Sequence, residues 1–60
     1  MGRKPCILVM DEDVNACSYL ADLLRYFGYG VDCVFSLTAA LSRLRLRPYD
    51  GLIVDSMTMG

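Results

Sequence analysis

Two short apolar runs, at about 6–10 and 51–55, each end at an aspartate, Asp11 in the first case and Asp55 in the second. Neither run alternates polar with apolar residues, which is typical of strands buried on both faces of a parallel sheet. The chain between them predicts a helix, a strand and a second helix, at about 14–27, 30–35 and 37–47. This alternation favours parallel strands joined by right-handed crossovers, an open α/β layer.

Local signals predict where the two helices begin and end. Asp13 and Ser36 are N-cap residue types that stand directly before helical spacing begins. Gly28 suits a left-handed helix end, and Pro48 cannot continue a helix. Apolar residues at helical spacing are the predicted buried stripes, Cys17, Leu20, Ala21, Leu24 and Phe27 in the first helix and Leu37, Ala40, Leu41 and Leu44 in the second.

Size and composition restrict the classes that remain. The chain has 60 residues, of which 55% are hydrophobic, so its apolar material exceeds what so small a body can cover. We therefore expect a partner chain or a remainder of the same chain.

A net charge of −1 excludes a strongly basic nucleic-acid arm, and no apolar run approaches the ~20 residues of a membrane helix. We expect a cytoplasmic protein whose three cysteines are free thiols, since no CxxC pair and no histidine is present.

Acidic residues follow two of the predicted strands. If those strands are neighbours, Asp11, Glu12 and Asp55 converge at the carboxyl edge of the sheet, where α/β proteins gather functional groups. Three carboxylates repel one another, and a hard divalent cation such as Mg²⁺ relieves that repulsion. The plainer interpretation is that these carboxylates are solvated or cap a helix. Arg43, Arg45 and Arg47 predict an exposed, cationic helix end and no nucleic-acid site in this segment.

Four motifs in order resemble the first half of a response-regulator receiver domain. They are Ile-Leu-Val-Met-Asp-Glu-Asp at 7–13, Gly-Tyr-Gly-Val at 28–31, Ala-Leu at 40–41 and Tyr-Asp-Gly-Leu-Ile-Val-Asp at 49–55. The resemblance implies a flavodoxin-like fold with strand order 2-1-3-4-5, of which 1–60 would supply strands 2, 1 and 3. It implies that Asp55 accepts a phosphoryl group from a sensor histidine kinase or phosphotransfer protein. Asp11 and Glu12 would hold Mg²⁺, with Asp55 and the backbone carbonyl of Met57 completing the protein ligands.

The chain departs from the family pattern at several positions. Glu12 stands where Asp is more common, and Met59 stands where the family usually has proline. The family's later Ser or Thr and Lys, which contact the phosphoryl group, have no counterpart in these residues. The resemblance implies a substrate of a kinase more than an enzyme. It also leaves the third strand as a bare edge, and we expect self-association there.

Two other functional classes remain open. A pseudo-receiver would serve as an interaction or dimerisation module and would never take phosphate. A haloacid-dehalogenase-like phosphohydrolase also opens with an apolar strand and Asp-x-Asp, which would make Asp11 the nucleophile and Asp13 the general acid/base, with Mg²⁺.

Overall fold

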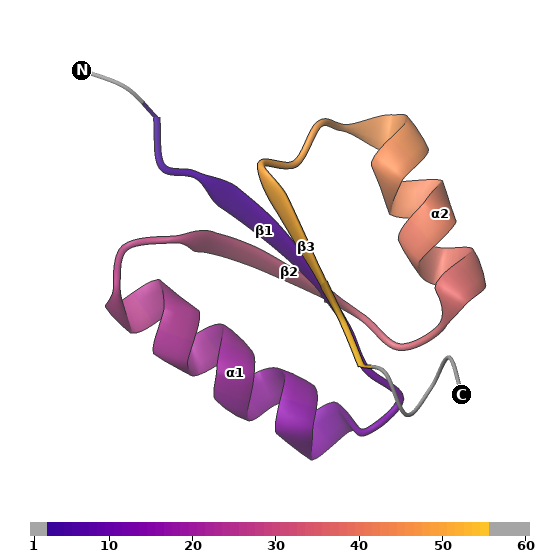
Figure 1. Ribbon diagram of the computed structural model, residues 1–60, viewed down its shortest axis with the longest axis horizontal. Helices are drawn as coiled ribbons and strands as arrows, with labels where there is room; N and C mark the ends of the chain where they lie inside the picture. The colour runs from indigo at the N-terminus through magenta and orange to yellow at the C-terminus, as the bar shows by residue number, and fades with distance from the viewer. Residues whose placement is uncertain (1–2, 56–60) are drawn as a thin grey trace.

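The computed structural model describes residues 3–55 as a three-stranded parallel sheet with two helices (Figure 1). The strand order β2-β1-β3 confirms the predicted fold class, half of a flavodoxin-like α/β sheet. Every element begins at its predicted residue, and all but the first strand end one residue earlier than predicted. The elements are β1 (Cys6–Met10), α1 (Val14–Tyr26), β2 (Gly30–Val34), α2 (Leu37–Leu46) and β3 (Gly51–Val54). No helix within 3–55 is long and apolar enough to cross a membrane.

The central strand β1 is the core of the molecule. It pairs with β2 from Cys6 to Met10 and with β3 from Ile7 to Met10. Its side chains alternate between two helices, because successive residues of a strand point to opposite faces. Val9 packs in the cluster that includes α1, whereas Leu8 and Met10 pack in the cluster that includes α2. These three side chains are no more than 1% exposed, so the predicted burial on both faces is confirmed for β1.

Helix α1 begins and ends where the sequence predicts caps. The Asp13 carboxylate accepts hydrogen bonds from the backbone N–H groups of Asn15 at 3.0 Å and Ala16 at 3.3 Å. Gly28 follows the helix with a φ of +97°, a conformation that L side chains rarely adopt. On the inner face, Cys17 and Ala21 are buried against Val9 and Val31. Leu20 and Leu24 also pack against this cluster and are partly buried, so the helix docks through small side chains at its centre and two leucines beside them.

Helix α2 docks through a narrower face than its apolar pattern predicts. Ser36 caps it by accepting the Ala39 N–H at 3.1 Å, and Ala40 is buried against the sheet. The rest of the predicted stripe is wrong as core, because Leu37, Leu41 and Leu44 are 40–52% exposed. Ala39 and Ala40 pack in the cluster with the sheet, whereas these leucines stay about half exposed. Phe27, predicted as core after α1, is likewise 66% exposed.

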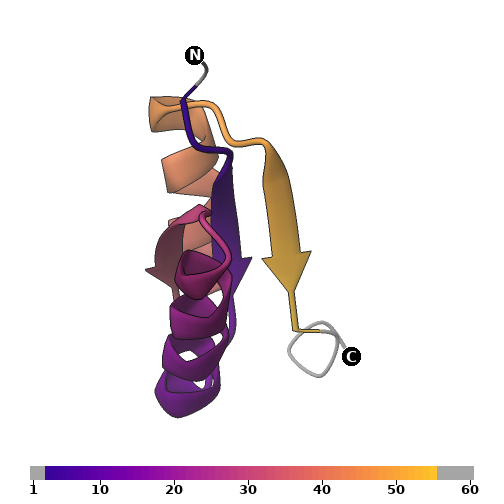
Figure 2. The ribbon, with the colours of Figure 1, turned by 90° about the vertical axis from the view of Figure 1, so that its left-hand side faces the viewer.

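The third strand, predicted as buried, is half exposed. Leu52 is 49% and Ile53 38% exposed, although both lie on a strand that pairs with the buried β1. The two helices pack over β1 and β2, and Figure 2 shows β3 standing to one side of both. Within residues 3–55, β1 is the only strand that pairs with β3. The prediction failed because burial of a strand needs cover on both faces, which this part of the chain does not supply.

Candidate functional site at the carboxyl edge of the sheet

The topology brings Asp11 and Asp55 to one edge of the sheet. Met10 and Val54 are paired in register, and the two aspartates are the residues that follow them. The Asp55 N–H donates to the Met10 carbonyl at 3.1 Å, and the Asp11 N–H donates to the Val34 carbonyl at 3.1 Å. In Figure 1 the chain runs from the carboxyl end of β1 into the start of α1, and β3 ends beside β1, with which it pairs. Both aspartates therefore stand where α/β sheets place functional groups.

The acidic loop after β1 has a defined local structure. One oxygen of the Asp11 carboxylate accepts the Asp13 N–H at 2.9 Å, which closes a tight turn. Asp13 is occupied by capping α1, so its carboxylate faces the helix N–H groups. Asp11 is half-buried and Glu12 is exposed. The loop thus holds Asp11 in place while leaving Glu12 toward solvent.

The acidic side chains at this edge are oxygen donors, the type of ligand that a hard cation such as Mg²⁺ prefers. Within 3–55 no group of three or more His, Cys, Asp or Glu side chains is arranged to hold a metal ion. Two carboxylates nevertheless suffice for Mg²⁺, which usually keeps several waters and takes one or two carboxylates together with substrate phosphate. Asp11 and Asp55, at the ends of adjacent strands, are the candidate carboxylates at this edge. The predicted fourth ligand, the carbonyl of Met57, lies outside the described residues.

A second polar cluster, which the sequence pattern did not reveal, surrounds Asp32 of β2. Its carboxylate accepts a hydrogen bond from the Tyr49 hydroxyl and forms ion pairs with Arg43 at 3.5 Å and Arg47 at 3.4 Å. The Arg47 guanidinium also lies 5.3 Å from the centre of the Tyr49 ring. Burial, and then the hydrogen bond to Asp32, raise the pKa of Tyr49. The i,i+4 arginines were visible in the sequence, but their acidic partner is on a separate strand and gave no local signal.

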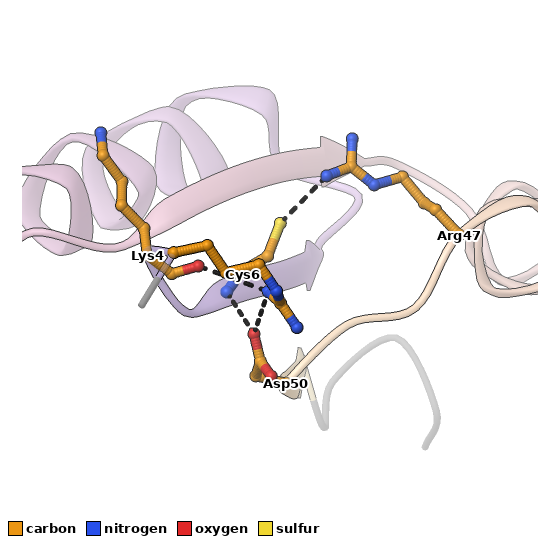
Figure 3. A network of polar contacts seen from close by, with 5 residues as sticks. Lys4, Cys6, Arg47 and Asp50 are labelled. Carbon is orange, nitrogen blue, oxygen red and sulfur yellow. Dashed lines mark hydrogen bonds and ion pairs between the residues drawn. The ribbon is translucent and has the colours of Figure 1, made fainter. Parts of the chain in front are cut away.

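Asp50 joins the starts of β1 and β3 (Figure 3). Its carboxylate accepts the Cys6 N–H at 2.7 Å and pairs with the Arg3 guanidinium at 3.1 Å. The hydrogen bond from Cys6, and then Arg3, lower the pKa of this carboxyl. The junction secures the end of the sheet opposite the acidic edge and contributes no group to it.

The lowered pKa of Asp50 predicts an acid-dependent loss of stability. Because the folded-state pKa lies below the unfolded value of about 4, this contribution is present above that value and is lost as pH falls through the folded pKa. Asp50→Asn keeps an oxygen acceptor but cannot ionise. Urea unfolding at several pH values should show the gap between wild type and Asp50→Asn closing below about pH 4. Parallel curves throughout the acid range would contradict this role for Asp50.

Comparison with known proteins gives this geometry a context. The chain is 41% identical over 49 residues to the transcriptional regulatory protein ZraR of Salmonella typhimurium, a match over 82% of this chain and 11% of that protein. It is 35% identical over 54 residues to ZraR of Klebsiella oxytoca, over 90% of this chain and 12% of that protein. ZraR of Escherichia coli strain K12 matches at 39% identity over 49 residues, again over 82% of this chain and 11% of that protein.

These relatives are two-component response regulators, so the similarity gives the chain a response-regulator context. The chain spans only 11–12% of their length, and the similarity supports a receiver-type region at most. No protein-family model matches the chain. No solved structure matches it either.

Proposed function

We propose that this segment is the phosphoacceptor part of a response-regulator receiver, with Asp55 as the acceptor. The observation that supports the proposal most is the placement of Asp11 and Asp55 at the carboxyl ends of adjacent parallel strands. The similarity to response regulators supports the same function. The donor would be a phosphohistidine on a sensor kinase or phosphotransfer protein.

The proposed reaction needs little beyond position and charge neutralisation, as phosphoryl transfer generally does. A carboxylate oxygen of Asp55 attacks the phosphorus, the new P–O bond forms, and the bond to the donor histidine nitrogen breaks. The hydrogen bond from the Asp55 N–H to Met10 fixes the backbone from which the carboxylate projects. The turn closed by Asp11 and Asp13 fixes the Asp11 carboxylate at the end of the neighbouring strand.

Asp11 and Asp55 would hold Mg²⁺, with Glu12 close by in sequence as a third acidic group. The ion would neutralise charge on the equatorial phosphoryl oxygens during transfer. Asp11 is suited to this role because one of its oxygens is engaged by the Asp13 N–H, which orients the other. In this proposal the segment is a substrate of its kinase rather than an enzyme.

A small-molecule donor tests the proposal without a cognate kinase. The purified protein is incubated with acetyl phosphate in Mg²⁺ or in a chelator, and its intact mass is measured. We expect a gain of about 80 Da, the mass of one phosphoryl group, in the sample that contains Mg²⁺ and no gain in the sample that contains the chelator. A gain that is equal in chelator, or no gain in either condition, would overturn the proposal; the second result would favour a pseudo-receiver.

We also propose that β3 mediates self-association. Leu52 and Ile53 are half exposed on a strand that, within residues 3–55, pairs on one side only, and such edges template further pairing. Sedimentation of the wild type should show concentration-dependent association that Leu52→Lys weakens, since charge on an edge opposes pairing. A compact monomer at all concentrations would contradict association.

A further inference from the structure

The side chains of Cys17 and Cys33 lie together beneath α1. Cys17 is the fourth residue of the helix and is fully buried, whereas Cys33 is on β2 and is partly exposed. The Cys33 thiol contacts the Cys17 carbonyl, with 3.8 Å between sulfur and oxygen. The Cys17 thiol contacts the Val9 carbonyl, also at 3.8 Å. Because Val9 and Cys33 are paired in register, both sulfurs stand over the same position of the sheet.

We propose that Cys17 and Cys33 are an oxidation site at which a peroxide drives formation of a disulfide between α1 and β2. This inference is independent of the phosphoacceptor proposal. Cys17 and Cys33 are free thiols that pack in one cluster, and such proximity is what a bridge needs if the fold is to stay unchanged. Both residues lie in the contact between α1 and the sheet, so the native packing brings their side chains together.

The remaining cysteine provides an internal comparison. Cys6 is buried on β1, and strand alternation places it on the opposite face of the sheet from Val9. Its sulfur contacts the Arg47 guanidinium of the segment after α2 at 3.5 Å, as Figure 3 shows. The sheet therefore lies between Cys6 and the other two thiols. A bridge from Cys6 would require the fold to open.

The burial of the two residues sets the order of steps. Cys33 is the less buried residue of the two, so peroxide oxidises its thiol first to a sulfenic acid and is itself reduced, releasing one water. The Cys17 sulfur then attacks the Cys33 sulfur, the S–S bond forms, and the sulfenic hydroxyl leaves with the Cys17 proton as a second water. Two thiols have then lost two electrons and two protons to one peroxide.

The state of Cys17 agrees with this order. Burial, and then the hydrogen bond to Cys33, raise the pKa of Cys17 to about 12, so the residue stays a thiol at neutral pH. A buried thiol of this kind reacts poorly with an oxidant in solution. Its attack on an oxidised Cys33 relies on proximity, because the two side chains pack in one cluster. Cys17 is thus suited to resolve an oxidised Cys33 and unsuited to be oxidised first.

Thiol counting and peptide mapping test the proposal. The folded protein is treated with hydrogen peroxide, its remaining thiols are blocked with N-ethylmaleimide under denaturing conditions, and it is digested. Cleavage after Glu12 and Arg25 places the three cysteines in three different peptides. We expect maleimide labelling to fall from three sites to one, at Cys6, with a Cys17–Cys33 peptide pair that dithiothreitol releases.

Two variants and one denaturing condition test whether the bridge joins Cys17 to Cys33 and depends on the fold. Cys6→Ser should form the bridge as the wild type does, whereas Cys33→Ser should keep both of its thiols reactive to maleimide after peroxide. Peroxide applied in urea should yield no preference for the Cys17–Cys33 pair, because the helix–sheet contact is gone. A bridge to Cys6, a link between chains, or overoxidation of Cys33 to sulfinic acid without a bridge would overturn the proposal.

Discussion

Asp55→Asn is expected to gain no phosphoryl group from acetyl phosphate under conditions in which the wild type gains one. The amide of asparagine matches the carboxylate in shape but is not a nucleophile toward phosphorus. The backbone contact from residue 55 to Met10 does not depend on the side chain, so the sheet edge should persist. The expected loss is complete, and intact mass spectrometry of the two proteins measures it.

The chain offers a matched control for that substitution. Asp22→Asn makes the same chemical change on α1, where Asp22 is exposed and pairs with Arg25 at 3.6 Å. It should be phosphorylated like the wild type. Asp11→Asn should lie between the two, because it removes a proposed cation ligand and leaves the acceptor in place. Phosphorylation of Asp55→Asn at the wild-type level would show that the acceptor is elsewhere.

Leu8→Ala is expected to destabilise the fold by about 2–5 kcal/mol, the usual cost of truncating a buried leucine. Leu8 is fully buried at the middle of the central strand and belongs to the cluster that joins the sheet to α2. At about 0.05–0.15 kcal/mol per residue, a chain of this size has a stability of about 3–9 kcal/mol. The substitution therefore removes a large part of the total, and urea unfolding should show a much lower midpoint.

Leu46→Ala is the control for this prediction. Leu46 is the last residue of α2 and is 78% exposed, so its truncation creates no cavity and should change stability by no more than about 0.5 kcal/mol. Both variants remove the same atoms. Equal losses at the two positions would mean that burial in β1 is not what stabilises the fold.

Local patterns predicted the elements well because each depends on neighbouring residues. Asp13 and Ser36 cap their helices, Gly28 adopts the left-handed conformation, and β1 is buried on both faces as its unbroken apolar run indicates. Periodicity did less well for the leucines of α2. An apolar stripe shows which side of a helix avoids water, but not how much of that side its neighbours cover.

Some features of the candidate site could be predicted from the sequence and others could not. The strand-terminal positions of Asp11 and Asp55 follow from parallel topology, so the sequence could predict that they share an edge. The sequence also predicted that Asp13 caps the helix, but it could not predict that Glu12 would be exposed while Asp11 is half-buried. The Asp32 cluster was invisible, because its partners are brought together by helix α2 folding back over β2. Contacts of this kind depend on the packing of whole elements.

The most direct test of the acidic edge is to locate bound cation on the folded protein. Mn²⁺ can replace Mg²⁺ at oxygen ligands, and as a paramagnetic ion it broadens the NMR signals of nearby amides. At low Mn²⁺, the amide signals of Asp11, Glu12 and Asp55 should broaden first, and excess Mg²⁺ should restore them. The amides of Tyr29 and Gly30, at the opposite end of the sheet, should stay sharp. Uniform broadening, or broadening that begins at another acidic residue such as Asp22, would contradict a shared cation site at Asp11 and Asp55.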